Sequence, residues 1–379
     1  MKLDVAGAFS RLDAYCKRAD YCGWDVFDGL NSRVFKNTVA NRSRLFRLAW
    51  IQLFKRSPVN LRYLAGVKKG LNPKGMALFA SGLIRLGRLE EAERLLDRLK
   101  HMHCTGYEGY CWGYNFPWES RAYYVPLGVP NMVTTVFVAN AFLDHFSATG
   151  DSESLKFGHG ACQFILTHLV LFEREDTLGL GYIPGQYVIV HNANMLGAAL
   201  LGRVFSIIGD EAFYSKSRKA MSYGISALNK DCLWPYGELG HHGFIDNFHT
   251  AFNLVSIASW SRYTGDLLWE AELKKAYRAY LDTFWLDDGC PKYYHDSLYP
   301  LDIHCSAQGI VTLLFLSGYD DHSEELLGKI LVWVLTNMQD KTGYFYYQKS
   351  KYYINKISYI RWAQSWMFYA LSLYLSGLK

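Results

Sequence analysis

Apolar and polar residues alternate with the period of an α-helix along most of the chain, and the helical segments come in pairs. The first segment of each pair is apolar or small on nearly every face, which is typical of a buried helix. The second segment is amphipathic, as at Leu273, Ala276, Tyr277, Tyr280 and Phe284. Each pair therefore predicts a helical hairpin with one inner and one outer helix.

The pairs recur at a nearly constant interval, between 54 and 61 residues. Their amphipathic members are expected at 89–102, 152–171, 211–228, 267–285 and 323–338. Helical pairs at a fixed period predict a solenoid or a closed ring. The apolar members begin near Asn72, Asn131, Asn192, Asp246, Asp302 and Arg361.

The two ends of the chain favour a closed ring. The last apolar segment, 359–375, has no amphipathic partner after it, and the segment 3–19 has no apolar partner before it. If these two pack together, no hydrophobic end is left exposed, whereas an open solenoid needs polar capping repeats. We therefore predict an all-α fold, an (α/α)6 toroid or six-hairpin barrel. No linker divides residues 1–379, so we expect a single domain.

Aromatic residues are concentrated in the loops that lead into the apolar segments. The chain has 28 Tyr and 11 Trp, and many lie at 107–118, 181–187, 234–249, 293–299 and 344–353. At one end of a ring these loops converge, and Trp and Tyr beside Asn, Asp and His suit the apolar faces and hydroxyl edges of sugars. Any one of these aromatic side chains, taken alone, more often only covers the barrel core. The set as a whole predicts an aromatic binding cleft formed by rim loops.

Charge is distributed unevenly, because residues 29–89 contain 13 Lys and Arg and no Asp or Glu, while the whole chain has a net charge of +5. Within this basic segment, the predicted helix 42–54 places Arg42, Arg44 and Arg47 beside apolar residues. Basic amphipathic helices bind anionic membranes, so we expect such a surface or a lipid-linked oligosaccharide as a partner. The alternative is that the helix packs its apolar face on the outside of the ring. No nucleic-acid-binding motif is present, so we expect no such partner.

Neither a signal peptide nor an apolar run long enough to cross a bilayer is visible in the sequence. The eight cysteines include no CxxC pair and show no disulfide framework, so we expect reduced thiols. These features predict a cytoplasmic protein, peripheral at the inner face of the membrane.

Four short motifs accompany the repeat: Trp-Gly-Tyr-Asn at 112–115, Asp-Asn-Phe-His at 246–249, Asp-Ile-His-Cys-Ser-Ala-Gln at 302–308 and Tyr-Ile-Arg-Trp-Ala-Gln-Ser-Trp at 359–366. Over nearly the whole chain they resemble the six-hairpin glycosidase-like superfamily and, within it, the VpsJ-like proteins of bacterial polysaccharide gene clusters. Relatives in this superfamily include hydrolases, lyases and uronyl epimerases, and no catalytic set of any one of them matches residue by residue. The resemblance implies a role in making or modifying a capsular, exopolysaccharide or lipopolysaccharide glycan.

Two chemistries compete for the predicted cleft. Glycoside hydrolysis requires two carboxyl groups that flank the bond. Asp246 and Asp302 would be acid and base, although both fall at helix starts, where a carboxylate often only caps the helix. Proton abstraction next to a uronate carboxylate requires a His or Tyr base and cationic or amide groups that bind the carboxylate. Asn247 and Arg361 are expected to bind that carboxylate.

Two further alternatives stay open. In the first, the protein is a non-catalytic glycan-binding or assembly protein, which would bind sugar without turnover. It resembles, more remotely, the zinc-binding subunits of protein prenyltransferases, and Asp288, Cys290 and His304 are residues of the right type, but the histidine comes too early in the chain. We expect no metal ion and no cofactor.

The predicted site lies at the rim, because each candidate is at or just before the start of an inner helix or in a rim loop. Helix N-termini bring partial positive charge to that end. Glu238 and Asp296 are further acidic candidates for hydrolysis. The candidate catalytic residues are Asp246, His249, Tyr294, Asp302 and His304, and the candidate substrate-binding residues are Trp112, Tyr114, Asn115, Trp118, Glu238, Asn247, Tyr299 and Arg361.

Overall fold

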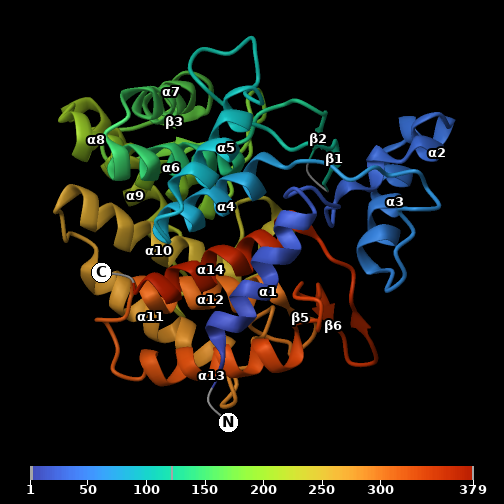
Figure 1. Cartoon of the computed structure of the whole chain (residues 1–379). Coiled ribbons are helices and arrows are strands. Elements are labelled where there is room, and N and C mark those ends of the chain that lie inside the picture. Colours follow the sequence, from blue (N-terminus) through green and yellow to red (C-terminus); the bar gives the residue numbers. More distant parts are fainter. Residues whose placement is uncertain (1–2, 121–122, 378–379) are drawn as a thin grey trace.

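The inner helices of the protein form a closed ring in a computed structural model that describes residues 3–120 and 123–377 (Figure 1). Each inner helix contacts the next one along the chain, and the last contacts the first. The predicted (α/α)6 toroid is therefore confirmed. The inner helices are α4 (Pro73–Arg85), α6 (Met132–Thr149), α8 (His191–Ile208), α10 (Asn247–Thr264), α12 (Ile303–Phe315) and α14 (Ser365–Ser376).

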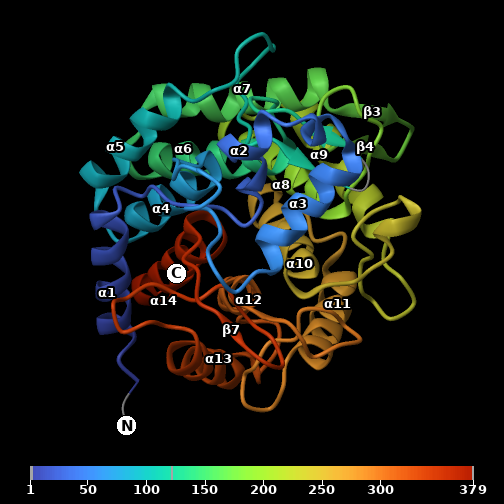
Figure 2. The ribbon, with the colours of Figure 1, turned by 90° about the vertical axis from the view of Figure 1, so that its right-hand side faces the viewer.

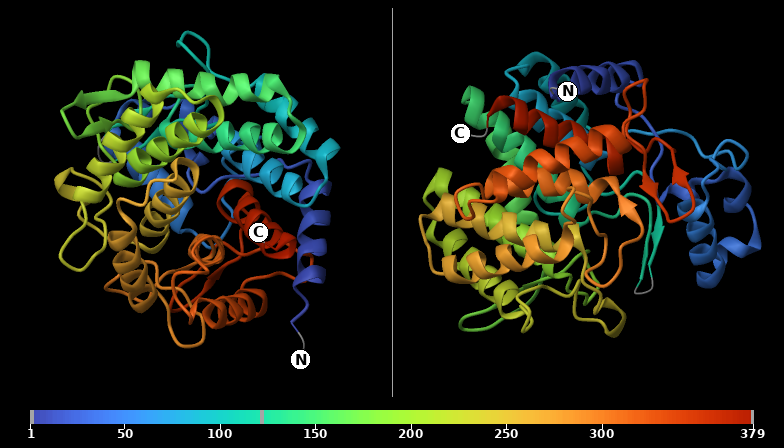
Figure 3. Two further views of the ribbon diagram at one scale, coloured as in Figure 1. Left: turned by 90° about the vertical axis from the view of Figure 1, so that its left-hand side faces the viewer. Right: turned by 90° about the horizontal axis from the view of Figure 1, so that it is seen from below.

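The outer ring is completed by the first helix of the chain, α1 (Val5–Arg18). It packs against α14 and α13, and the rings of Phe9 and Phe368 lie 4.9 Å apart. The pairing of the two chain ends is confirmed, and Figure 3 shows α1 beside the C-terminal helix. The other outer helices are α5 (Leu89–Lys100), α7 (Ser152–His168), α9 (Glu211–Ser226), α11 (Glu270–Phe284) and α13 (Ser323–Asn337).

The Asn and Asp residues that recur in the sequence are mostly N-caps of inner helices. Asn72, Asn131, Asp246 and Asp302 each accept a hydrogen bond from a backbone N–H of the first turn. Such caps stabilise helix starts by about 1 kcal/mol each. The sixth inner helix begins differently, with a π-helical turn, η4 (Ile360–Gln364), that leads into α14.

The rim of the ring is formed by the loops that run from an outer helix to the next inner helix. They contain short antiparallel strands, so the rim has a fixed backbone. In the third of these sheets, Asp302 pairs with Gln348. The sheets are β1 (Trp118–Glu119) with β2 (Tyr124–Val125), β3 (Val170–Glu173) with β4 (Leu178–Leu180), and β5 (Leu301–Asp302) with β6 (Gln348–Lys349) and β7 (Ile354–Asn355).

The basic segment lies over this rim (Figure 2). It contains α3 (Arg44–Arg56), which begins and ends two residues later than predicted. One face of α3 buries Ile51 and Phe54, while Leu45 and Phe46 on the helix are 72% and 57% exposed. The segment also includes the short helices α2 (Arg33–Lys36) and η2 (Val39–Arg42). A third short helix, η1 (Asp28–Asn31), begins one residue before the segment. No described helix is long and apolar enough to cross a membrane.

Candidate functional site

A cavity of about 380 Å³ lies at the rim end of the ring, between the inner-helix starts and the basic segment. Most of its wall is aromatic, and the rings come from rim loops of several repeats, from α10, from η4 and from the loop after α1. The aromatic side chains are Phe27, Tyr114, Phe116, Trp118, Tyr123, Tyr182, Tyr236, Phe244, Phe248, Phe252, Tyr293, Tyr294 and Trp362. The polar side chains are Lys55, Lys74, Ser120, Asn192, His241, His242, Asp246, His249, His304 and Arg361.

Asp246 and His249 form a hydrogen-bonded pair in this wall. Asp246 caps α10 by accepting from the backbone N–H of His249 at 2.9 Å, and its other oxygen lies 2.6 Å from Nδ1 of the same residue. If Nδ1 carries the proton, Nε2 is left as the proton acceptor. The carboxylate also stabilises the imidazolium that forms when Nε2 takes a proton.

His304 is the second histidine in the wall, and it is 1% exposed. Its imidazole stacks on Phe248 at 4.5 Å and lies 4.7 Å from the rings of Trp362 and Trp366. Within the described residues, neither ring nitrogen has a hydrogen-bond partner. Burial, together with the nearby charges of Lys74 and Arg361, keeps its pKa well below the usual value. The neutral imidazole therefore has one donor and one acceptor nitrogen, both buried without a partner in the described residues.

Arg361 lies in the wall but is already paired. Its Nε and Nη2 donate to the two oxygens of Asp25 at 2.6 and 2.7 Å, and both residues are buried. The guanidinium also lies over the rings of Tyr114 and Phe116, at 5.0 and 5.7 Å. The side of the guanidinium that can donate two parallel hydrogen bonds to a carboxylate is occupied by Asp25. Arg361 is therefore less suited to bind a substrate carboxylate than the sequence suggested.

Lys74 was missed by the sequence analysis. It is the second residue of α4 and is 3% exposed, yet it lines the cavity. Its ammonium lies 4.4, 5.0 and 5.3 Å from the ring centroids of Phe137, Trp366 and Phe252. Lys55 of α3 also lines the cavity. The acid-free composition of residues 29–89 was the only sequence signal for either lysine.

The carboxylate pair expected for hydrolysis does not converge on the cavity. Asp246 is the only acidic residue in the described lining. Asp302 lies outside it, because its oxygens accept hydrogen bonds from His304 N, Trp362 Nε1 and Gln348 Nε2 at 2.8, 2.9 and 2.6 Å. Burial raises its pKa to about 6. Glu238 and Asp296 are exposed and also lie outside the lining.

Four predicted sugar-binding residues are also placed elsewhere. Trp112 is buried in the core, where Nε1 donates to Leu99 O at 2.8 Å. Asn115 accepts from Asn72 Nδ2 at 2.8 Å, away from the cavity. Two further residues face away from the cavity: Asn247 accepts a hydrogen bond from the outer-helix residue Tyr280, and Tyr299 is an exposed loop residue.

The predicted residues that line the cavity are Tyr114, Trp118, Asp246, His249, Tyr294, His304 and Arg361. Other rings of the wall, such as Tyr182 and Tyr236, come from loops that the sequence marked as aromatic, although no pattern singled them out. The hydroxyl groups of Tyr182 and Tyr114 lie 3.3 Å apart. Tyr236 lies 4.7 Å from His249, so it adds an aromatic face beside the predicted base.

Zinc-type ligands do not gather in the described part of the chain. No group of three or more His, Cys, Asp or Glu side chains there is placed to hold a metal ion. Asp288 accepts from the backbone N–H of Cys290 in the loop after α11, whereas His304 lies among the aromatic rings of the cavity. The residues of the prenyltransferase-like alternative are therefore not brought together.

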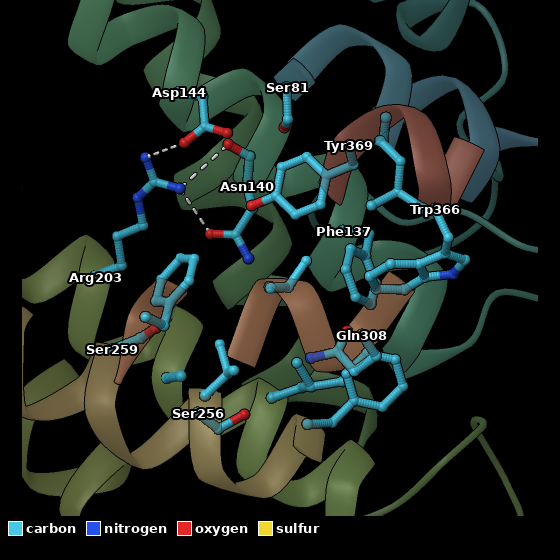
Figure 4. A pocket seen from close by; sticks show the side chains of 18 of the residues that line it. Ser81, Phe137, Asn140, Asp144, Arg203, Ser256, Ser259, Gln308, Trp366 and Tyr369 are labelled. Atoms are coloured by element: carbon cyan, nitrogen blue, oxygen red, sulfur yellow. Dashed lines mark hydrogen bonds and ion pairs between the residues drawn. The ribbon is translucent and has the colours of Figure 1, made fainter. Parts of the chain in front are cut away.

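A second, smaller cavity of about 100 Å³ lies further along the inner helices (Figure 4). Arg203 pairs there with Asp144 at 2.7 Å and with the side chain of Asn140 at 2.8 Å. Phe252 lines both cavities, and Phe137 and Trp366 line the second. A layer of aromatic rings thus lies between the two cavities and forms the floor of the larger one.

Comparison with known proteins gives the fold. No family model and no curated protein matches the sequence. Among solved structures, cellobiose 2-epimerase from Bacillus thermoamylovorans is similar with a TM-score of 0.66 and 13% identity over 80% of this chain and 86% of that one. The chain has the fold of the six-hairpin glycosidase-like superfamily.

Two other structures of the same fold widen the comparison. A family 76 α-mannanase from Bacteroides thetaiotaomicron has a TM-score of 0.59 and 13% identity over 80% of this chain and 85% of that one. D-mannose isomerase has a TM-score of 0.58 and 12% identity over 80% of this chain and 87% of that one. At such identities the six-hairpin fold is shared, while the resemblance to the VpsJ-like proteins stays a prediction.

Proposed function

We propose that the protein is a sugar-modifying enzyme that abstracts a proton from a sugar carbon, as an epimerase or lyase acting on uronate residues of a glycan. The observation that carries the proposal concerns two of the four histidines that line the aromatic cavity: His249 is paired with Asp246, and His304 is without a partner. Solved structures of similar fold include a cellobiose 2-epimerase and a D-mannose isomerase, which supports chemistry on sugars.

The two imidazoles both contact the ring of Phe248, at centroid distances of 4.1 Å for His249 and 4.5 Å for His304. One sugar bound against this ring can therefore touch both. Nε2 of His249 takes the proton from C5, next to the carboxylate, and Asp246 stabilises the resulting imidazolium. The electron pair of the broken C–H bond passes into the carboxylate as an enolate.

The fate of the enolate decides between the two reactions. If Tyr294 returns a proton to the opposite face of C5, the product is the C5 epimer. If the electron pair instead expels the group at C4, the product is an unsaturated sugar and the chain is cleaved. Tyr294 lines the cavity, and burial raises its pKa, so its hydroxyl is protonated and able to donate.

The decisive experiment is incubation in deuterated water with uronate-containing glycans from the protein's own gene cluster. NMR and mass spectrometry should show deuterium at C5 or a new unsaturated product, and His249→Ala should abolish both. New reducing ends without either change would identify a hydrolase. Binding without any product would identify the non-catalytic glycan-binding alternative.

We also propose that the enzyme acts in bacterial surface-polysaccharide synthesis at the cytoplasmic face of an anionic membrane, on a lipid-linked glycan. The support is the exposed Leu45 and Phe46 on α3, in a segment without acidic residues, and Lys55 of the same helix in the cavity wall. Part of the basic charge is neutralised internally, since Arg47 pairs with Glu119 at 2.6 Å. Basic residues near an anionic surface contribute about 1 kcal/mol each.

Flotation with phosphatidylglycerol and phosphatidylcholine vesicles tests membrane binding. We expect binding only to the anionic vesicles, with release at high salt, and loss of binding in Phe46→Glu. Leu267→Glu is the matched control, because Leu267 is 59% exposed on a loop between α10 and α11. Equal binding by both variants, or binding that is insensitive to salt, would contradict membrane attachment through α3.

A further inference from the structure

The buried basic side chains of the protein differ in whether they have an acidic partner. Arg62 pairs with Asp28, Arg203 with Asp144 and Arg361 with Asp25, each within 2.7 Å. Lys74 is buried to the same degree, but no carboxylate of the described residues lies within salt-bridge distance of its ammonium. Buried charges are normally paired, so an unpaired one in a cavity wall indicates a place for an anion.

Three aromatic rings of the floor lie around the amine of Lys74. The rings of Phe137, Phe252 and Trp366 come from α6, α10 and α14, and Figure 4 shows Phe137 and Trp366 beside each other. Cation–π contacts stabilise a cation without supplying a hydrogen-bond acceptor. Since Lys74 also lines the cavity, its N–H donors remain available to a ligand there.

The position of Lys74 relative to the second histidine fits the proposed reaction. His304 lies 4.7 Å from Trp366 and 6.0 Å from Phe252, two of the three rings that hold the ammonium. A carboxylate bound at Lys74 therefore places its adjacent carbon near His304. The sequence suggested Arg361 and Asn247 for this role. Arg361 is already paired with Asp25, and Asn247 accepts a hydrogen bond from Tyr280.

We propose that Lys74 is the residue that binds the carboxylate of the sugar acid and gives the cavity its preference for anionic sugars. The identity of the ligand as a sugar rests on the proposed function. The buried amine without an acidic partner in the floor of the cavity rests on the geometry alone.

Binding of an anion at this place is coupled to protonation. Burial, and after it the charge of Arg361, keeps the pKa of Lys74 well below its usual value, while Asp25 acts in the opposite direction. The other titratable groups that line the cavity are His304, His249 with Asp246, His241, His242 and Lys55, together with the hydroxyl groups of Tyr114, Tyr123, Tyr182, Tyr236, Tyr293 and Tyr294. A carboxylate beside the amine raises its pKa again, so binding takes up a proton.

Calorimetric titration with sodium glucuronate and with its neutral isostere glucuronamide tests the proposal. The wild type should bind glucuronate about 30-fold more tightly, the size expected for one charge-assisted contact. Lys74→Met should reduce this preference to about threefold or less without weakening glucuronamide binding. Lys69→Met is the matched control, because Lys69 also lies over an aromatic ring, Trp24 at 4.9 Å, but outside the cavity.

Titrations in buffers of different ionisation enthalpy should also show net proton uptake with glucuronate, and none with glucuronamide or in Lys74→Met. If Lys74→Met does not fold, ¹³C-dimethylation of the lysines of the wild type replaces it. One dimethyl-lysine signal should then shift with glucuronate and not with glucuronamide.

An unchanged glucuronate preference in Lys74→Met, no preference in the wild type, or no such lysine signal would overturn the role of Lys74. Deuterium exchange at C5 separates this from the proposed function. Exchange without an anion preference removes the Lys74 proposal only, and an anion preference without exchange removes the reaction only.

Discussion

Asp246 accepts two hydrogen bonds from one residue, His249: the backbone N–H donates at 2.9 Å, and Nδ1 of the imidazole lies at 2.6 Å. The same carboxylate thus begins helix α10 and orients the imidazole that lines the cavity. A helix cap needs only an acceptor oxygen, whereas a base needs the correct tautomer. The two roles can therefore be separated by a substitution that keeps the shape of the side chain.

Asp246→Asn should make this separation visible. The amide still caps α10, so the free energy of unfolding should change by less than about 1 kcal/mol. Its NH2 group favours the other tautomer of His249, so the rate of deuterium exchange at C5 should fall at least about 100-fold. Urea unfolding and NMR measure the two quantities.

Asp302→Asn is the control for Asp246→Asn, because Asp302 also caps an inner helix but lies outside the cavity lining. The rate of deuterium exchange at C5 in Asp302→Asn should stay close to that of the wild type. Loss of all product in Asp302→Asn, with Asp246→Asn active, would favour a hydrolase in which Asp302 is catalytic.

Removal of the Phe9 ring should weaken the closure of the ring. Phe9 of α1 is buried against Phe368 of α14 at 4.9 Å. Truncation of a buried phenylalanine to alanine destabilises proteins by about 3–5 kcal/mol, and we expect this decrease in the free energy of unfolding for Phe9→Ala. Tyr374→Ala, on the exposed side of α14, should change it by about 0.5 kcal/mol or less. Similar values for the two variants in urea unfolding would show that α1 does not stabilise the ring.

His304 should make the stability of the protein depend on pH. Its pKa in the folded state lies well below the unfolded value, first because of burial and then because of Lys74. Below about pH 6.5 the unfolded state therefore binds a proton that the folded state does not, and stability falls as the pH falls. As the pH falls, the free energy of unfolding of His304→Phe should therefore decrease by up to about 1.4 kcal/mol less per pH unit than that of the wild type.

The comparison for His304→Phe is His322→Phe, since His322 is an exposed residue before α13. Urea unfolding between pH 5 and pH 7.5 measures both. His304→Phe and the wild type losing stability in parallel would show that this imidazole titrates freely in the folded protein.

The buried pair of Asp25 and Arg361 joins the loop after α1 to the start of the last inner helix. Asp25→Ala leaves the guanidinium buried without a partner and should lower the free energy of unfolding by about 3–5 kcal/mol. The double variant Asp25→Ala, Arg361→Met should recover a large part of this loss, because no unpaired guanidinium is then left buried at this place. A double variant that is less stable than Asp25→Ala alone would contradict this explanation.

The ring and its helix starts could be predicted from the sequence because their signals are local. The 3.6-residue period and the N-cap residues act within one or two turns, so Asn131 and Asp246 mark helix starts in the sequence and in the structure alike. The histidines were found for the same reason, since His249 and His304 follow such caps.

The remaining wall of the cavity depends on side-chain directions that sequence spacing does not determine. Trp112 and Trp118 belong to one aromatic loop, but Trp112 enters the core while Trp118 lines the cavity. Asp302 precedes its helix as Asp246 does, but the pairing of β5 with β6 turns it towards Gln348. The role of Lys74 arises only when three other helices bring their rings around it.

The contact between α1 and α14 has a consequence for synthesis of the protein on the ribosome. At about 5–20 residues per second, roughly 20 to 75 seconds pass between translation of Phe9 and of its partner Phe368. During that time the apolar face of α1 is not covered by α14, and the floor of the cavity lacks Trp366. Nascent chains released before this last helix should therefore be held by chaperones or degraded.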